Sequence, residues 1–133
     1  MKIIVVGASG TIGKHVTGEL KKRHEVVSVG TKSGSVHVDI RDSNSILQMY
    51  EKIGHFDALV CCAGEAFFGD FQTTKEEDLF IGIRSKLMGQ VNLVRIGARF
   101  ANDGGSFTLT SGILADDPIR TGVNSSMVNG ALN

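Results

Sequence analysis

Three glycines at three-residue spacing stand near the start of the chain, where an apolar run at residues 2–6 gives way to a helical pattern. Such an arrangement predicts a strand that turns directly into a helix and holds a pyrophosphate. Gly7 allows the tight turn, Gly10 lets the backbone approach the phosphates, and Gly13 lets the helix pack against the sheet. The amides at the helix start would face the anion. We therefore predict that a dinucleotide is held by Gly7, Ser9, Gly10, Thr11, Ile12 and Gly13.

A phosphate loop for nucleoside triphosphates is the competing interpretation of these glycines. That motif requires a Gly five residues before its Gly-Lys pair and a Ser or Thr after the pair. Here the pair Gly13-Lys14 has Ala8 in the first of these places and His15 in the second. The spacing therefore favours a dinucleotide, with a glycine-rich turn that binds no ligand as the alternative.

The end of the second expected strand, residues 25–30, bears on the choice of cofactor. In many dinucleotide folds an Asp or Glu at this place accepts hydrogen bonds from the adenosine ribose. This chain has Gly30 there, followed by Thr31, Lys32 and Ser33, a cation between two hydroxyls that can hold a ribose phosphate. We therefore expect NADP in preference to NAD. The alternative is that Lys32 is an ordinary surface lysine.

Two further strand ends carry candidate binding residues. Asp39 and Ile40 follow a short strand at residues 36–38, where the carboxylate could lie near an adenine ring. Cys62, Ala63 and Gly64 stand at the end of a fourth strand that begins at residue 56. Ligands of open parallel sheets bind outside the carboxyl ends of the strands. We expect these residues to complete the cofactor site, although Asp39 could instead cap the helix that follows it.

The elements that position these residues alternate along the chain between strands and helices, which is typical of an α/β fold with a parallel sheet. Besides the strands already named, we expect helices at residues 11–23, 42–53 and 75–100 and a fifth strand at 106–110. The first helix should turn Ile12, Val16 and Leu20 toward the core. The long third helix should begin near Thr73 or Thr74 and face inward with Leu79, Ile83, Leu87, Val91, Val94 and Ala98.

Composition limits the classes of function. The chain has 133 residues, enough for one domain over residues 1–133 and too few for two of usual size. Lys plus Arg equals Asp plus Glu at 14 each, which argues against nucleic acid or a membrane as the partner. Because no signal peptide or membrane-length apolar segment is evident, we expect a cytoplasmic protein. The adjacent Cys61 and Cys62 fit a reducing compartment, and the histidines lack the spacing of a metal site.

Taken in order, these motifs resemble those of the short-chain dehydrogenase/reductase family. The resemblance rests on four segments that each follow a strand: Gly7-x-x-Gly10-x-x-Gly13, Asp39-Ile40, Cys61-Cys62-Ala63-Gly64 and Thr110-Ser111-Gly112. It covers nearly the whole chain and implies a doubly wound parallel sheet, in the strand order 3-2-1-4-5, that carries NAD or NADP. Cys61 and Cys62 stand where the family usually has two asparagines.

The resemblance also implies three catalytic positions. In the family's reductases a Ser orients the substrate carbonyl, a Tyr donates the proton, and a Lys four residues later lowers the pKa of that Tyr. Ser111 fits the Ser, but Ser125 and Asn129 stand in the places of the Tyr and the Lys. An alkyl hydroxyl is a far weaker acid than a phenol, and Asn carries no charge. The sole tyrosine, Tyr50, lies in an earlier helix, so the usual Tyr-Lys mechanism is excluded.

A lysine offers a replacement for the missing proton donor. Lys86 lies three residues before Gly89, at a place in the long helix where the family often has an Asn that assists a proton relay. We hypothesise that Lys86 and Ser111 polarise a carbonyl together and that Lys86 donates the proton. The alternatives are that Lys86 anchors the ribose or the backbone, or lies on the surface.

These patterns predict an NADP-dependent oxidoreductase that acts on a small carbonyl or alcohol. The missing Tyr and Lys support an alternative, a non-catalytic NADP-binding sensor or interaction module. The family normally continues through further strands beyond the position of Asn133, so the chain looks truncated. If nothing follows, the fifth strand is an open edge that invites pairing with another chain, and we expect a homo-oligomer.

Overall fold

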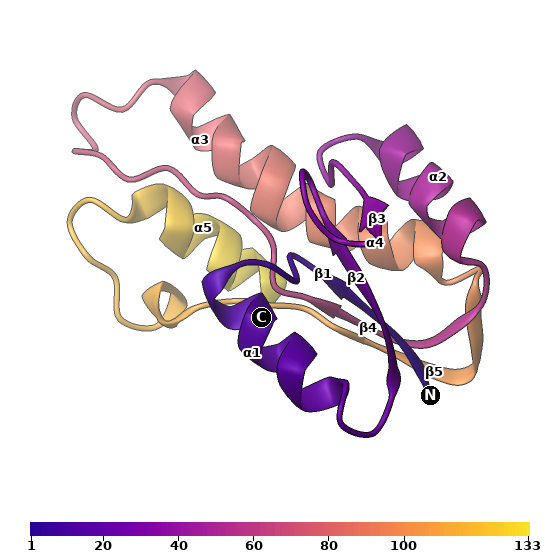
Figure 1. The fold of residues 1–133 in the computed structure, drawn as a ribbon. Coiled ribbons are helices and arrows are strands. Elements are labelled where there is room, and N and C mark those ends of the chain that lie inside the picture. Colours follow the sequence, from indigo (N-terminus) through magenta and orange to yellow (C-terminus); the bar gives the residue numbers. More distant parts are fainter.

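A computed structural model describes residues 1–133 and contains a five-stranded sheet with helices on both faces (Figure 1). The strand order is β3-β2-β1-β4-β5 and every pair is parallel, so the predicted doubly wound sheet is confirmed. The strands are β1 (Lys2–Val6), β2 (Glu25–Gly30), β3 (Val36–His37), β4 (Phe56–Cys61) and β5 (Ala101–Thr108). The helices are α1 (Thr11–Leu20), α2 (Ser43–Ile53), α3 (Glu76–Gly82), α4 (Met88–Gly97) and α5 (Val123–Leu132). None of them combines the length and the apolar character that a membrane crossing requires.

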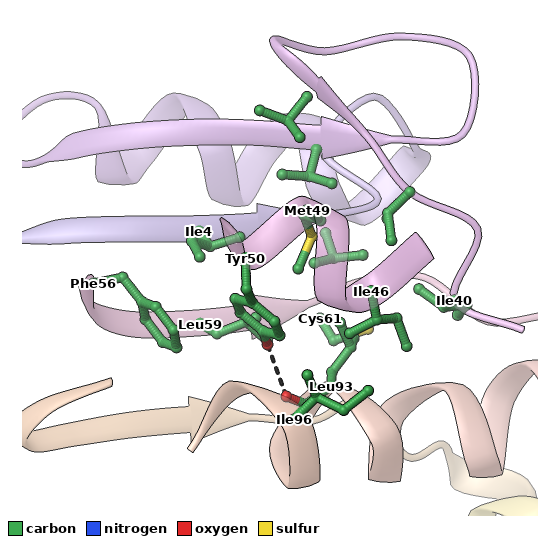
Figure 2. Close-up of a cluster of buried hydrophobic side chains, with 14 residues drawn as sticks. Ile4, Ile40, Ile46, Met49, Tyr50, Phe56, Leu59, Cys61, Leu93 and Ile96 are labelled. Atoms are coloured by element: carbon green, nitrogen blue, oxygen red, sulfur yellow. Dashed lines mark hydrogen bonds between the residues drawn. The ribbon is translucent and has the colours of Figure 1, made fainter. Parts of the chain in front are cut away.

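The larger of two apolar clusters lies between one face of the sheet and the helices α2 and α4, as Figure 2 shows. Tyr50 of α2 is fully buried there and stacks on Phe56 and Phe100, with ring centroids 5.5 and 5.3 Å away. Its hydroxyl donates a hydrogen bond of 2.7 Å to the carbonyl oxygen of Leu93 in α4. The tyrosine therefore joins two helices in the core.

Helix α1 covers the opposite face of the sheet. Val16 and Leu20 pack against the smaller apolar cluster, as predicted. Ile12, however, is 59% exposed, so the predicted inward stripe is wrong at its first position. The helix approaches the sheet through Gly13 and Thr17, which are its buried residues, and this places Ile12 on the outer side.

The helix predicted over residues 75–100 is divided into three segments. A π-helical segment, Ile83–Leu87, separates α3 from α4 and carries Ser85 and Lys86. Such segments are rare and occur mostly at functional sites. The inward face also differs from the predicted one: Val91 is 37% exposed, whereas α4 buries Gly89, Gln90, Leu93, Ile96 and Gly97. Small residues bring this helix close to its neighbours, because a Cβ on Gly97 would overlap the Tyr50 hydroxyl.

Strand β5 begins at Ala101, five residues earlier than predicted. The segment Asp103-Gly104-Gly105 lies within the strand, where its register with β4 shifts. Gly104 has a φ of 77° there, and between the pairs Phe56–Ala101 and Ala58–Ser106 strand β5 has three residues more than β4, as in an extended bulge. The other edge of β5 has no strand partner.

Remaining differences concern the ends of helices. Helix α1 ends at Leu20 rather than near Arg23. Helix α3 begins after Lys75, whose amide donates to the side chain of Asp78 at 3.0 Å. The two threonines proposed as caps, residues 73 and 74, instead donate their hydroxyls to the carbonyl oxygen of Asp70.

Candidate functional site

A cavity of about 570 Å³ lies outside the carboxyl ends of β1, β2, β3 and β4. Most of the predicted cofactor residues line it: Gly7, Ser9, Gly10, Thr31, Lys32, Ser33, Asp39, Ile40, Cys62, Ala63 and Gly64. Three predicted residues, Thr11, Ile12 and Gly13, lie in the first turn of α1 and do not line the cavity. The sequence analysis did not assign six other lining residues to the site: Val6, Gly30, Val38, Arg41, Glu65 and Ser85.

The glycine loop is as tightly packed as its spacing suggested. Gly7 has a φ of 80°, which favours glycine, and a Cβ there would lie 2.9 Å from backbone atoms of Cys62 and Ala63. A Cβ on Gly13 would overlap the carbonyl oxygen of Gly7, so only glycine lets α1 start directly against this turn. Gly10 precedes α1 in an extended conformation and provides no side-chain cap. The amides of the first helical turn are therefore available to an anion.

The loop after β2 closes one side of the cavity. A Cβ on Gly30 would lie 2.7 Å from the carbonyl oxygen of Ser33, so this loop leaves no room for a carboxylate side chain at residue 30. The Ser33 hydroxyl donates to the Ser9 hydroxyl at 2.8 Å and ties the loop to the glycine turn. Lys32 forms no ion pair, since the three ion pairs of the structure involve other residues. An uncompensated cation therefore borders the cavity.

Asp39 lies at the cavity as predicted, but its carboxylate is already engaged. The guanidinium of Arg41 donates to both carboxylate oxygens, from Nε at 2.9 Å and from Nη2 at 2.8 Å. The Arg41 amide also donates to this carboxylate at 3.0 Å. These hydrogen bonds from Arg41 hold the pKa of the Asp39 carboxyl below its usual range. Arg41 thus presents a fixed planar cation to the cavity, and the spacing of an acid and an arginine two residues apart was the signal that could have identified it.

Two lining residues that the sequence analysis missed connect the loop after β4 to the π-helical segment. The hydroxyl of Ser85 accepts a hydrogen bond of 3.0 Å from the amide of Glu65. Gly64, with a φ of 141°, packs directly on Lys86, because a Cβ on this glycine would lie 3.0 Å from three carbons of that lysine. Lys86 therefore begins immediately beneath the wall of the cavity.

The structure brings together the two predicted catalytic residues, although neither lines the cavity itself. The Lys86 ammonium donates to the carbonyl oxygen of Ser111 at 3.3 Å. The Ser111 hydroxyl donates at 3.0 Å to the carbonyl oxygen of Asn129, in α5. Burial lowers the pKa of the Lys86 ammonium below its ordinary value. The pair consequently offers a cation with a weakened hold on its proton, bonded to the backbone of the residue that carries the hydroxyl.

Ser125 and Asn129, the residues in place of the family's Tyr and Lys, are buried and bonded to each other. The side-chain amide of Asn129 donates to the Ser125 hydroxyl at 3.2 Å. Asn129 is 2% exposed and Ser125 is 5% exposed. Gly112 packs on this amide, since a Cβ there would lie 2.8 Å from the Asn129 nitrogen. Asn129 therefore helps to hold Ser111 in place, and neither Ser125 nor Asn129 lines the cavity.

Two buried amide side chains that the sequence analysis missed hold these segments in place. Gln90 donates to the carbonyl oxygens of Lys86 and Thr110, both at 3.0 Å, and accepts from the Thr110 amide at 2.8 Å. Asn124 accepts from the amides of Phe67 and Gly82 at 2.9 and 3.1 Å. Polar residues inside apolar stretches were the available signal, but except for Lys86 their partners lie 20 to 57 residues away in sequence. No group of His, Cys, Asp and Glu side chains is arranged to hold a metal ion.

Comparisons with known proteins identify the family. A family model described as the NAD dependent epimerase/dehydratase family matches residues 3–118. The crystal structure of the protein lin1944 from Listeria innocua is 47% identical to this chain, with a TM-score of 0.98. A small-chain dehydrogenase in complex with NADPH is 28% identical, with a TM-score of 0.91. The chain belongs to the short-chain dehydrogenase/reductase family.

This chain spans only part of the length of its relatives. The match takes in 99% of this chain but 66% of the Listeria protein and 60% of the dehydrogenase crystallised with NADPH. A short-chain dehydrogenase/reductase from Serratia marcescens, 20% identical with a TM-score of 0.84, has the same fold. No match to a curated protein sequence was found. The family membership confirms the resemblance drawn from the motifs, and it places the chain in a class of NAD(P)-binding oxidoreductases.

Proposed function

We propose that this chain is the cofactor-binding part of an NADP-dependent reductase that acts on a small carbonyl or alcohol, with Lys86 as the proton donor. The observation that carries the proposal is the position of Lys86, whose ammonium lies 3.3 Å from the carbonyl oxygen of Ser111 and whose Cα, Cβ and Cγ pack on Gly64 of the cavity wall. The usual acid and its partner are replaced by Ser125 and Asn129, which are bonded to each other. The proton donor in this proposal is then Lys86, which the π-helical segment places next to Ser111.

The residues of the cavity fit an NADP molecule. Its pyrophosphate would be held by the glycine turn, where Gly7 and Gly10 let backbone amides approach an anion. The ribose phosphate would be held by Lys32, which has no carboxylate partner, with Thr31 and Ser33 beside it. The planar guanidinium of Arg41 would border the adenine end.

The preference for NADP has a direct test. NADPH should bind more tightly than NADH by at least about 1.5 kcal/mol, roughly tenfold, because charge-assisted hydrogen bonds are worth about that much. Lys32→Ala should remove most of this preference without weakening NADH, whereas Lys52→Ala, on the exposed side of α2, should leave it intact. Equal affinities of the unaltered protein for the two cofactors, measured by fluorescence titration, would contradict the assignment.

Proton transfer is the task assigned to the chain's own residues. When bound, the reduced nicotinamide supplies a hydride to the carbonyl carbon. The Ser111 hydroxyl turns from its Asn129 acceptor to donate to the substrate oxygen, and Lys86 transfers a proton to that oxygen as it takes the electron pair of the broken π-bond. The neutral amine then recovers a proton from water. The lowered pKa of Lys86 favours release of the proton at this point.

Replacement of the lysine separates this role from a binding role. Lys86→Met should lower turnover with a small aldehyde or ketone about a hundredfold or more, the usual size of a general-acid contribution, at nearly unchanged NADPH affinity. A lysine that merely anchors the ribose would give weaker NADPH binding and largely preserved turnover at saturation. Ser125→Ala is the matched control and should have little effect, because no phenol is lost. A collapse of activity in that control would transfer the chemistry from Lys86 to Ser125.

A non-catalytic NADP sensor is the second candidate, and one observation favours it. The Lys86 ammonium and the Ser111 hydroxyl both donate inward to backbone carbonyl oxygens. A site that never releases these donors would bind the cofactor without turnover. NADPH binding together with no NADPH consumption against a panel of small carbonyl compounds, measured on the longest form of the protein, would favour the sensor.

We also propose that the protein self-associates, in line with the expectation of a homo-oligomer. Within residues 1–133 the outer edge of β5 has no strand partner, and an unpaired edge can pair with another chain. Light scattering coupled to size exclusion should give a mass above that of one chain. A monomer at all protein concentrations would contradict this proposal.

A further inference from the structure

A second cavity, of about 370 Å³, lies between α1 and the turn that joins β2 to β3. One hydrophobic residue, Ala8, lines it together with Ser9, Lys14, Thr17, Gly18, Lys21, Ser28, Ser33 and Gly34. The hydrogen bond between the Ser33 and Ser9 hydroxyls, 2.8 Å long, stands where this cavity meets the cofactor cavity, because both serines line both. The second cavity is thus a neighbouring space that the proposed reaction does not use.

The charge of this second cavity is positive. Lys14 of α1 and Lys21, which follows the helix with helical dihedral angles, are seven residues apart and therefore lie on the same side of the helix. No Asp or Glu lines the cavity, and neither lysine forms an ion pair. The nearby acid of α1, Glu19, pairs with Lys22 at 2.6 Å instead. Two cations therefore face the cavity with no negative charge to balance them.

A buried hydroxyl in the wall of the second cavity lacks a partner. Thr17 is only 8% exposed, and its Oγ1 makes no hydrogen bond. Burial of a hydroxyl without a partner is unfavourable, so such groups are normally satisfied by protein, water or ligand. Next to Thr17, a Cβ on Gly18 would meet no atom within 4 Å, so nothing fills the adjoining space. Because Thr17 also lines the cavity, an oxygen atom bound there would lie next to its side chain.

We propose that the second cavity binds a phosphate group, either as the free anion or on a small phosphate ester, independently of the dinucleotide. Lys14 and Lys21 neutralise its charge, and the Thr17 hydroxyl donates to one of its oxygens. Tetrahedral oxyanions accept hydrogen bonds from ammonium and hydroxyl groups, which is the donor set found here. The proposal stands apart from the proposed reductase activity, because none of these three residues lines the cofactor cavity.

Inorganic phosphate is the probe for the first experiment, with the full chain at constant ionic strength. Calorimetric titration should show one saturable site. Lys14→Met and Lys21→Met should each weaken binding at least tenfold, whereas Lys22→Met, the neighbour of Lys21 outside the cavity, should not. Absence of saturable binding would overturn the proposal. So would an equal loss of phosphate affinity in Lys22→Met, because it would show a general effect of charge and not a site.

Thr17→Val separates the ligand role of the hydroxyl from a structural one. Valine keeps the shape of threonine and removes the unpartnered oxygen, so the melting temperature without phosphate should not fall while phosphate affinity drops severalfold. A lower melting temperature with unchanged phosphate affinity would refute the role given to Thr17. The source of the phosphate is resolved by repeating the titration with saturating NAD or NADP. Binding that persists with both supports a separate site, and binding abolished by NADP alone would assign this cavity to the ribose phosphate of the cofactor instead.

Discussion

Gly13→Ala tests the packing on which the whole cofactor site depends. A Cβ on Gly13 would overlap the carbonyl oxygen of Gly7 and lie 2.8 Å from its carbonyl carbon and 3.0 Å from the Cα of Ala8. All three are backbone atoms of the turn between β1 and α1, so no side chain can rotate away to relieve the contact. The added methyl group must therefore displace the start of α1 from the sheet.

The size of the effect follows from two opposing terms. Overpacking in a rigid place costs about 1–3 kcal/mol or more, and contacts with three backbone atoms justify about 3 kcal/mol. Alanine in place of glycine within a helix gains roughly 1 kcal/mol. The expected net loss of unfolding free energy for Gly13→Ala is therefore about 2 kcal/mol.

Gly18→Ala is the matched control, in the same helix and with the same chemical change. A Cβ at this position meets nothing within 4 Å, so only the helix-propensity gain of roughly 1 kcal/mol applies. Since that gain is common to both variants, the difference between them isolates the clash, about 3 kcal/mol. For a chain of this size the melting temperatures should differ by about 10 °C. Calorimetry and urea unfolding would measure this, and two variants of equal stability would refute the account of Gly13.

Three other perturbations have defined outcomes. Tyr50→Phe should lower the free energy of unfolding, measured with urea, by about 1–2 kcal/mol, because it removes the hydrogen bond that the Tyr50 hydroxyl donates to the buried carbonyl of Leu93. Full retention of stability would show that this hydrogen bond contributes nothing. Burial raises the pKa of the Cys62 thiol and raises the pKa of the Cys61 thiol to about 11. Alkylation at neutral pH should therefore be slow at Cys62 and absent at Cys61 in the native state. Bound NADP should slow the reaction of Cys62 further, because this residue lines the cofactor cavity. Mass spectrometry of the modified sites measures the two rates, and a faster reaction at Cys61 than at Cys62 would contradict this order. The reductase rate should fall as pH rises through the lowered pKa of Lys86, since the donor must be protonated, and a rate that rises with pH would exclude this acid.

The order of strands and most of the cofactor cavity could be predicted from sequence because both depend on local patterns. Gly7, Gly10 and Gly13 define a turn within seven residues. The carboxyl ends of parallel strands meet at one edge, so Lys32 and Asp39 could be placed at the same cavity without knowledge of any contact between them. The residue types at the strand ends were therefore enough to place these two residues at the cavity.

Features that depend on distant contacts were out of reach. Helical periodicity placed Ile12 inward, but the depth at which α1 meets the sheet is set by the contact of Gly13 with the turn. The π-helical segment that carries Lys86 leaves no trace in the spacing of apolar residues. Gln90 looks like one polar residue in an apolar helix, and its role follows only from the approach of Thr110, 20 residues away.

Ser111 connects the two departures from the family's catalytic pattern. Its hydroxyl bonds to the backbone of Asn129 in α5, and its carbonyl oxygen bonds to the ammonium of Lys86 from the opposite side. The family pattern would place a positive charge on α5, at residue 129, where this chain has a neutral amide. This chain has its positive charge at residue 86, in the π-helical segment. One cation therefore still lies beside Ser111, which is the arrangement that the proposed role of Lys86 as proton donor requires.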